Sequence, residues 1–64
     1  MKRLQVIKIL RKHGCVLVRE GSKHTVFLNS ENNKTSTVPR HNEVDDLLVK
    51  KIFKDLGIKE KNRV

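Results

Sequence analysis

Residues 16–29 read VLVREGSKHTVFLN, and this pattern sets the architecture expected of the whole chain. The first part, residues 16–20, is rich in β-branched side chains and lies between two glycines, which is typical of a strand. The second part, residues 24–29, has the same character, and residues 21–23 between them form a short turn that opens with glycine. The sequence therefore predicts a β-hairpin with His24 at the mouth of its turn, exposed to solvent.

The segment after this hairpin predicts one more strand. Residues 30–34 are polar and rich in asparagine, which favours a second hairpin loop. Residues 35–38 then form a short third strand, and Pro39 ends it because proline has no backbone N–H to donate to a ladder. Three strands joined by two tight turns give an antiparallel meander.

An amphipathic helix is expected before the hairpin, over residues 2–13. Its apolar side carries Leu4, Val6, Ile7 and Leu10, with Ile9 at the border. Basic side chains occupy much of the remaining surface. Gly14 supplies the left-handed residue that ends such a helix, and His13 suits the negative end of the helix dipole.

A second amphipathic helix is expected after the meander, over residues 46–56. Its apolar side chains fall within about half of the helical wheel. The opposite side carries Lys50, Lys51 and Lys54. Asp45 and Asp46 suit its N-terminus as a cap and as partners of the dipole, and Gly57 ends it.

These elements predict an α+β fold of the order α-β-β-β-α, a three-stranded antiparallel sheet with two helices packed on one face. The 64 residues are expected to form a single domain, residues 1–64, in which residues 59–64 are a frayed basic tail. A chain this short buries only about 60% of the surface of its unfolded form. We therefore expect no deep small-molecule pocket, and chemistry only in a shallow groove on a large substrate.

The charge of the chain indicates an anionic partner. Fifteen Lys and Arg residues against seven Asp and Glu give a formal net charge of +8, which favours nucleic acid. With two Phe and no Tyr or Trp, a platform for stacking single-stranded bases is poorly supported. Binding is therefore expected to depend on charge rather than on stacking.

Cysteine content and hydropathy exclude several other classes of protein. Cys15 is the only cysteine, so neither an internal disulfide nor a zinc site built from cysteine pairs is possible. Its apolar neighbours predict a buried thiol. No apolar stretch approaches the ~20 residues of a membrane span, and no signal-peptide pattern is present at the start. We expect a cytoplasmic protein without membrane contact.

His24 offers the chemistry that a small ribonuclease needs. Imidazole changes its protonation at about pH 6.5, so one histidine can remove the 2′-hydroxyl proton of RNA or protonate the leaving 5′-oxygen. Neighbouring cations and N–H groups would stabilise the charge on the phosphate. The candidates for RNA binding are Ser22, Lys23, Lys34, Arg40, Lys50 and Lys51, with the backbone N–H groups of Gly21 and Ser22 as a small anion-binding nest.

The group that carries the second proton is left open by the sequence. His41 is the first candidate for an assisting residue, and a lysine, a water molecule or no group at all are the alternatives. A purely structural role for His41, just before the second helix, also stays open. His13 is expected to act only as a cation at the end of the first helix.

Four short stretches carry a family resemblance. They read GSKH at residues 21–24, TVPRH at 37–41, EV at 43–44 and KIFKDLGI at 51–58. Together they resemble the HicA family of toxin ribonucleases, the small partners in HicA–HicB type II toxin–antitoxin pairs. The similarity runs across nearly the whole chain.

The resemblance implies a fold like that of double-stranded-RNA-binding domains and metal-independent cleavage of mRNA without a cofactor. It also implies that the histidine of the GSKH stretch, His24, is the single catalytic histidine, and that a HicB-type antitoxin covers the active surface. The chain departs from many relatives at Asp45 and Asp46, where they open the second helix with proline or glycine. These acidic groups weaken any phosphate contact at that helix terminus.

Two other functions fit the same residues. The first is a non-catalytic RNA-binding module, in which Lys50 and Lys51 would contact the backbone of a duplex. The second is an interaction subunit that is basic because its protein partner is acidic. Cleavage of RNA separates both of these from a nuclease.

Overall fold

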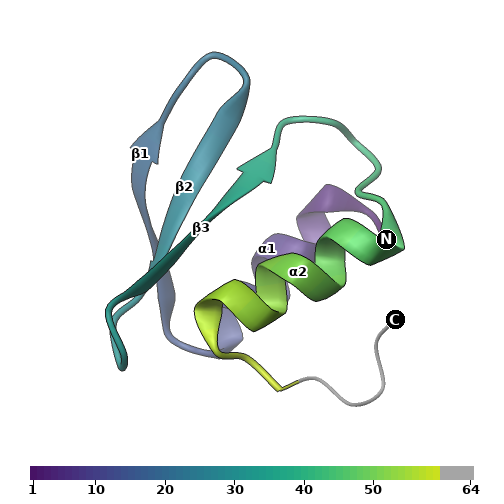
Figure 1. Ribbon diagram of the computed structural model, residues 1–64. Helices are drawn as coiled ribbons and strands as arrows, with labels where there is room; N and C mark the ends of the chain where they lie inside the picture. The colour runs from purple at the N-terminus through teal and green to yellow at the C-terminus, as the bar shows by residue number, and fades with distance from the viewer. Residues whose placement is uncertain (60–64) are drawn as a thin grey trace.

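The computed structural model describes residues 1–59 and has the expected order of elements (Figure 1). They are α1 (Arg3–Lys12), β1 (Cys15–Glu20), β2 (His24–Asn29), β3 (Lys34–Pro39) and α2 (Asp46–Leu56). The strands form one antiparallel sheet in the order β1-β2-β3. The predicted α-β-β-β-α fold is confirmed with small differences at the element ends. Of the expected basic tail, residues 60–64 lie outside the described part.

The register of the sheet places the two hairpin turns at opposite ends. His24 pairs with Pro39, and Asn29 pairs with Lys34 at the other end of the same ladder. The turn at residues 21–23 therefore lies at the end of the sheet where β3 finishes. The loop between β2 and β3 lies at the far end.

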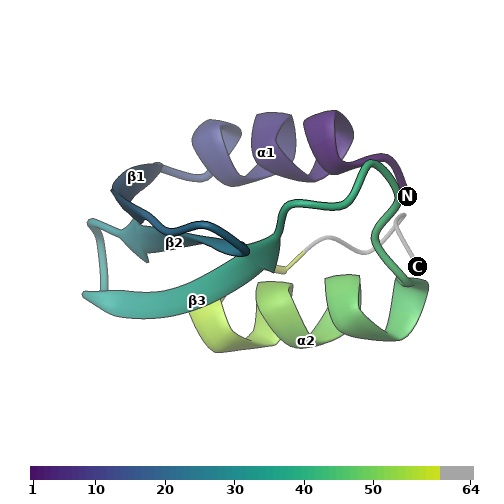
Figure 2. The ribbon, with the colours of Figure 1, turned by 90° about the horizontal axis from the view of Figure 1, so that it is seen from above.

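Both helices pack on one face of the sheet, where the core side chains meet. Figure 2 shows α1 beside β1 and α2 beside β3. Alternate residues of β2 are buried on this face, as the two-residue period of a strand requires: Thr25, Phe27 and Asn29. The apolar core consists of Val6, Leu10, Cys15, Phe27, Val38, Val44, Val49, Ile52, Phe53, Leu56 and Ile58.

α1 turns a narrower apolar arc toward the core than the sequence predicted. Val6 and Leu10 are fully buried. Leu4 is 70% exposed, so its expected place on the buried side is wrong. At about 100° per residue, the Leu4 side chain points about 120–160° away from those of Val6 and Leu10. Arg3, three residues before Val6, occupies the arc beside them instead.

α2 is fixed at both ends, as its sequence predicted. The Asp45 carboxylate caps the helix by accepting a hydrogen bond from the Leu47 N–H at 3.2 Å. Gly57 ends it in the left-handed conformation, with φ of 72°. The Leu56 carbonyl, in the last turn, accepts a hydrogen bond of 2.8 Å from Nδ2 of buried Asn29. The C-terminus of α2 is therefore attached to the end of β2.

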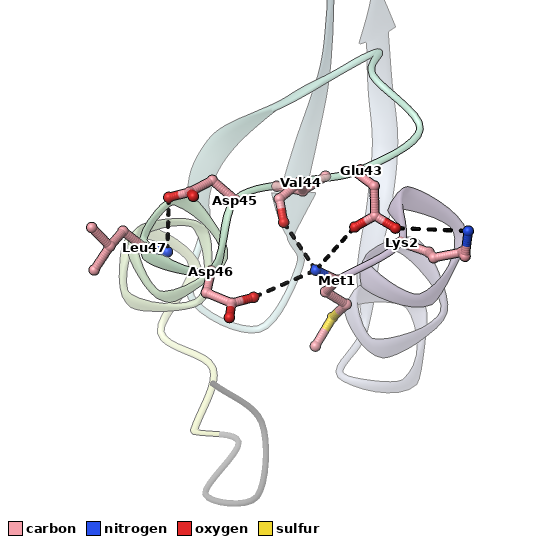
Figure 3. A network of polar contacts seen from close by, with 7 residues as sticks. All are labelled: Met1, Lys2, Glu43, Val44, Asp45, Asp46 and Leu47. Atoms are coloured by element: carbon pink, nitrogen blue, oxygen red, sulfur yellow. Dashed lines mark hydrogen bonds and ion pairs between the residues drawn. The ribbon is translucent and has the colours of Figure 1, made fainter.

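The segment between β3 and α2 is attached to the start of α1. The Met1 amino group donates to the Val44 carbonyl at 3.0 Å (Figure 3). It also lies 3.5 Å from the Glu43 carboxylate and 3.4 Å from that of Asp46. Lys2 Nζ lies 3.7 Å from Glu43 on the other side. These contacts hold the segment against the helix layer at the end of the sheet where β3 finishes.

β1 is an edge strand with an exposed apolar surface. Val16, Leu17 and Val18 are each 45–49% exposed. The pairing with β2 shifts its register between Leu17 and Arg19, which marks a β-bulge or similar irregularity. Cys15, at the start of the strand, is buried as predicted, and burial raises the pKa of its thiol. Cys15 is the only buried residue of β1.

Candidate functional site

Two segments of the chain meet in a shallow cavity of about 500 Å³ at the end of the sheet. Its lining consists of Ser22, Lys23, His24, Pro39, Arg40 and His41, and we call it the mouth cavity. The sheet register explains the meeting, because His24 and Pro39 are cross-strand partners. Figure 1 shows the turn between β1 and β2 and the end of β3 at the upper end of the sheet.

The side chains of the mouth cavity are open to solvent. Ser22, Lys23, His24, Arg40 and His41 are all exposed, and Pro39 is half-buried. The prediction that His24 lies at the surface is therefore confirmed. A substrate too large to enter a pocket can reach this imidazole directly.

The turn that presents His24 is closed by backbone hydrogen bonds. The Gly21 N–H donates to the His24 carbonyl at 2.8 Å, which ties the ends of the turn together. The Arg40 N–H donates to the Lys23 carbonyl at 3.3 Å, which ties the turn to the end of β3. The expectation that Gly21 offers its N–H to a phosphate is therefore wrong, because the hairpin itself uses that donor.

Arg40 is already paired within the protein. Its Nη1 lies 2.7 Å from Oε2 of Glu20, the last residue of β1. The same nitrogen donates to the Gly21 carbonyl at 3.2 Å. Both side chains are about half exposed, so the pair is screened by solvent and weak. An incoming phosphate would compete with the carboxylate for this guanidinium.

Arg3 supports the mouth cavity from the side of α1, and it was not among the residues predicted from the sequence. Its Nε donates to the Pro39 carbonyl at 3.0 Å, and its Nη2 donates to Oγ1 of Thr25 at 2.9 Å. Thr25 is fully buried and directly follows His24. The sequence does contain a sign of this position. Arg3 lies three residues before buried Val6, and residues with this spacing share one face of a helix. The abundance of basic residues on this helix hides that signal.

The six residues of the mouth cavity bring together two imidazoles, an ammonium, a guanidinium and a hydroxyl, without a carboxylate among them. This set can exchange protons and bind an anion. Within residues 1–59, no group of three or more His, Cys, Asp or Glu side chains is placed to hold a metal ion.

Comparison with known families identifies the chain. A family model described as "HicA toxin of bacterial toxin-antitoxin" matches residues 4–58. The chain belongs to the HicA toxin family. The match covers nearly the whole chain and confirms the resemblance seen in the sequence. Comparison with curated proteins and with solved structures gave no match.

Three of the predicted RNA-binding residues of this HicA family member lie away from the mouth cavity. Lys34 begins β3 at the opposite end of the sheet, about 17 Å along the strand from Pro39. Lys50 and Lys51 lie exposed on α2. Lys51 Nζ is 2.9 Å from Oδ2 of Asp55, one helical turn later. These lysines therefore belong to a wider surface than the mouth cavity.

HicA toxins pair with an antitoxin in toxin–antitoxin systems. This member is a small α+β protein, and within its described residues no helix is long and apolar enough to cross a membrane.

Proposed function

We propose that this HicA toxin is an endoribonuclease that cleaves mRNA without a metal ion, with His24 as its proton-transfer residue. The observation that carries the proposal is the position of His24. It stands exposed in a cavity that also holds Lys23, Arg40 and His41. Membership of a toxin family supports a destructive activity, and the net charge of +8 supports an RNA substrate.

The reaction follows from groups that RNA itself supplies. The 2′-oxygen attacks the adjacent phosphorus, a new 2′-O–P bond forms, and the bond to the 5′-oxygen breaks. The products are a 2′,3′-cyclic phosphate and a 5′-hydroxyl. His24 accepts the 2′-hydroxyl proton or donates one to the leaving oxygen, and either role gives about 10²–10⁴-fold in rate.

The other groups of the mouth cavity have supporting roles in this proposal. Lys23 and Arg40 stabilise the charge that builds up on the phosphate, and the Ser22 hydroxyl donates a hydrogen bond to it. Both imidazoles line the same cavity, which supports His41 as the second proton carrier. The alternatives are a lysine, a water molecule or no second group at all.

Binding of the rest of the RNA extends beyond the mouth cavity. Lys34 at the far end of β3 and Lys50 and Lys51 on α2 contact phosphates of the same strand or of a folded segment. Each such contact releases counterions, so affinity falls with salt. A HicB-type antitoxin in the cytoplasm covers the mouth cavity and blocks RNA from His24.

The test is cleavage of a defined transcript by purified His24→Ala protein, with the chemistry of the new ends mapped. We expect the rate to fall by at least about 100-fold. Folding, measured by circular dichroism, and affinity for an RNA with a 2′-deoxy cleavage site should change little. Growth arrest on expression should disappear. His13→Gln is the matched control, because His13 lies at the end of α1, away from the mouth cavity.

Two results would overturn the proposal. Cleavage by His24→Ala at the parental rate would remove the role of His24. RNA that the parental protein binds and protects without cutting would assign the chain to the non-catalytic RNA-binding modules instead. The His41→Ala variant decides the assisting role, because loss of cleavage with unchanged RNA affinity supports His41 as the second proton carrier.

A further inference from the structure

Arg3 is the one side chain of α1 that reaches both strands behind the mouth cavity by hydrogen bonds that the structure describes. Its guanidinium donates from Nε to the Pro39 carbonyl at 3.0 Å and from Nη2 to Thr25 Oγ1 at 2.9 Å. Its backbone N–H donates to the Asn42 carbonyl at 2.9 Å. A single residue therefore contacts β2, the end of β3 and the loop that follows.

These three contacts involve residues that are neighbours of the mouth-cavity residues in sequence or in sheet register. Thr25 directly follows His24, and Pro39 is the cross-strand partner of His24. The Pro39 and Asn42 carbonyls stand on either side of the segment that carries Arg40 and His41. The geometry therefore couples the position of α1 to the separation of the two segments that line the mouth cavity.

We propose that Arg3 is a positioning residue that holds the two sides of the mouth cavity at the separation needed for RNA cleavage. The proposal rests on the proposed ribonuclease activity for its kinetic part and on the hydrogen bonds alone for its structural part. Arg3 contacts no reacting atom. It acts by fixing where His24 stands relative to Arg40 and His41.

The chemistry of the contact requires arginine. The planar guanidinium presents Nε and Nη2 in a fixed fork, so one side chain can meet a carbonyl and a hydroxyl at the same time. A lysine ammonium carries the same charge on a flexible stem and lacks this fork. Thr25 is fully buried, so its hydroxyl depends on a protein partner, and Arg3 is that partner.

Two substitutions test the fork from its two sides. Arg3→Lys keeps the positive charge and removes the planar fork of two N–H donors. Thr25→Val keeps the approximate shape of the buried side chain and removes the Oγ1 acceptor. Lys8→Gln is the control, because it removes a charge from an exposed position of the same helix. Each protein is compared with the parent in kcat, in affinity for an uncleavable 2′-deoxy RNA, and in the hydrogen exchange of single amides.

We expect Arg3→Lys and Thr25→Val to lower kcat by about 10–100-fold, the cost of a small misplacement of reacting groups. Affinity for the uncleavable RNA should stay within about twofold, because every side chain proposed to bind phosphate is retained. Exchange of the Arg40 amide, which bonds to the Lys23 carbonyl, should accelerate about tenfold. The Phe27 amide, deeper in the sheet, should keep its rate. Lys8→Gln should match the parent in kcat and in exchange.

The outcomes separate this proposal from the ribonuclease proposal. Parental kcat and parental Arg40 exchange in Arg3→Lys would overturn the positioning role. So would equal acceleration at Arg40 and Phe27, which would mean a general loss of stability. If His24→Ala cuts RNA as fast as the parent, the ribonuclease assignment fails, and the local exchange at Arg40 still decides whether Arg3 holds the mouth cavity.

Discussion

Arg40 Nη1 lies 2.7 Å from Glu20 Oε2, so the guanidinium at the edge of the mouth cavity already forms an ion pair with a carboxylate of the protein. The pair joins the end of β1 to the residue after β3, across the turn that presents His24. Both side chains are about half exposed, at 44% and 47%, so water and salt weaken the pair. In the RNA complex that we propose, Glu20 is a weak competitor of phosphate for Arg40.

Glu20→Gln is expected to raise RNA affinity. The change removes a negative charge beside the mouth cavity and leaves Arg40 available to phosphate. An exposed pair contributes about 0.2–1 kcal/mol, so the dissociation constant should fall by up to about fivefold at low salt and less at high salt. Fluorescence titration with the uncleavable RNA measures it. Glu31→Gln, in the loop at the far end of the sheet, is the control with the same charge change. An equal gain in RNA affinity in that variant would mean that the net charge of the protein, and not the Arg40–Glu20 pair, causes the effect.

Replacing Lys50 and Lys51 by Gln is expected to weaken RNA binding and flatten its salt dependence. Removal of each phosphate contact lowers the slope of log affinity against log salt by about 0.7–0.9. Titrations at a series of salt concentrations give that slope. A double change of Lys8 and Lys12 to Gln on α1 is the charge-matched control. An unchanged slope in the α2 variant would place the RNA surface elsewhere.

Asn29→Ala is expected to lower the free energy of unfolding by about 1–3 kcal/mol. The Asn29 side chain is buried, donates to the Leu56 carbonyl at 2.8 Å and accepts from the Glu31 N–H at 3.0 Å. Alanine leaves both backbone groups without this partner. Urea denaturation measures the loss. Asn33→Gly is the control in the same loop, because Asn33 has φ of 60°, which glycine adopts freely, and that variant should keep parental stability.

Acid is expected to remove a stabilising contribution of Asp55. A hydrogen bond from Lys51 and a weaker one from Ser36 lower the pKa of the Asp55 carboxyl below its ordinary value of 3.8, against an opposing effect of burial. Because the folded state binds this proton less readily than the unfolded state, the contribution is present above pH 3.8 and disappears as the pH falls below it. Urea denaturation in an acid pH series should show a shallower fall for Asp55→Asn. Identical pH profiles in the two proteins would contradict this.

Much of the fold could be predicted because its signals are local. Glycine and asparagine mark both turns, and strand periodicity holds through β2, where every second residue is buried. Asp45 and Gly57 mark the ends of α2 through capping contacts that involve only near neighbours in the chain. The exposed position of His24 follows from the same local pattern.

Long-range contacts account for what the sequence could not predict. The Arg3 fork joins residues more than twenty positions apart, and no local pattern encodes such a bond. A helical wheel of α1 that is centred on all its apolar residues places Leu4 on the buried side. In the structure only the arc around Val6 and Leu10 is fully buried, and Leu4 lies outside it. The sequence alone does not show that the Gly21 N–H is used within the turn. Its hydrogen bond to the His24 carbonyl depends on the exact turn geometry, which the sequence does not specify.

The irregular pairing in β1 has a consequence for the behaviour of the protein at high concentration. A flat edge strand of valine and leucine can pair with the edge strand of another copy, and repeated pairing produces fibres. The register shift between Leu17 and Arg19 interrupts this edge, as a β-bulge does, and Arg19 and Glu20 add charged side chains beside it. Both features oppose the stacking of copies along this edge, although its three apolar side chains, Val16, Leu17 and Val18, are about half exposed.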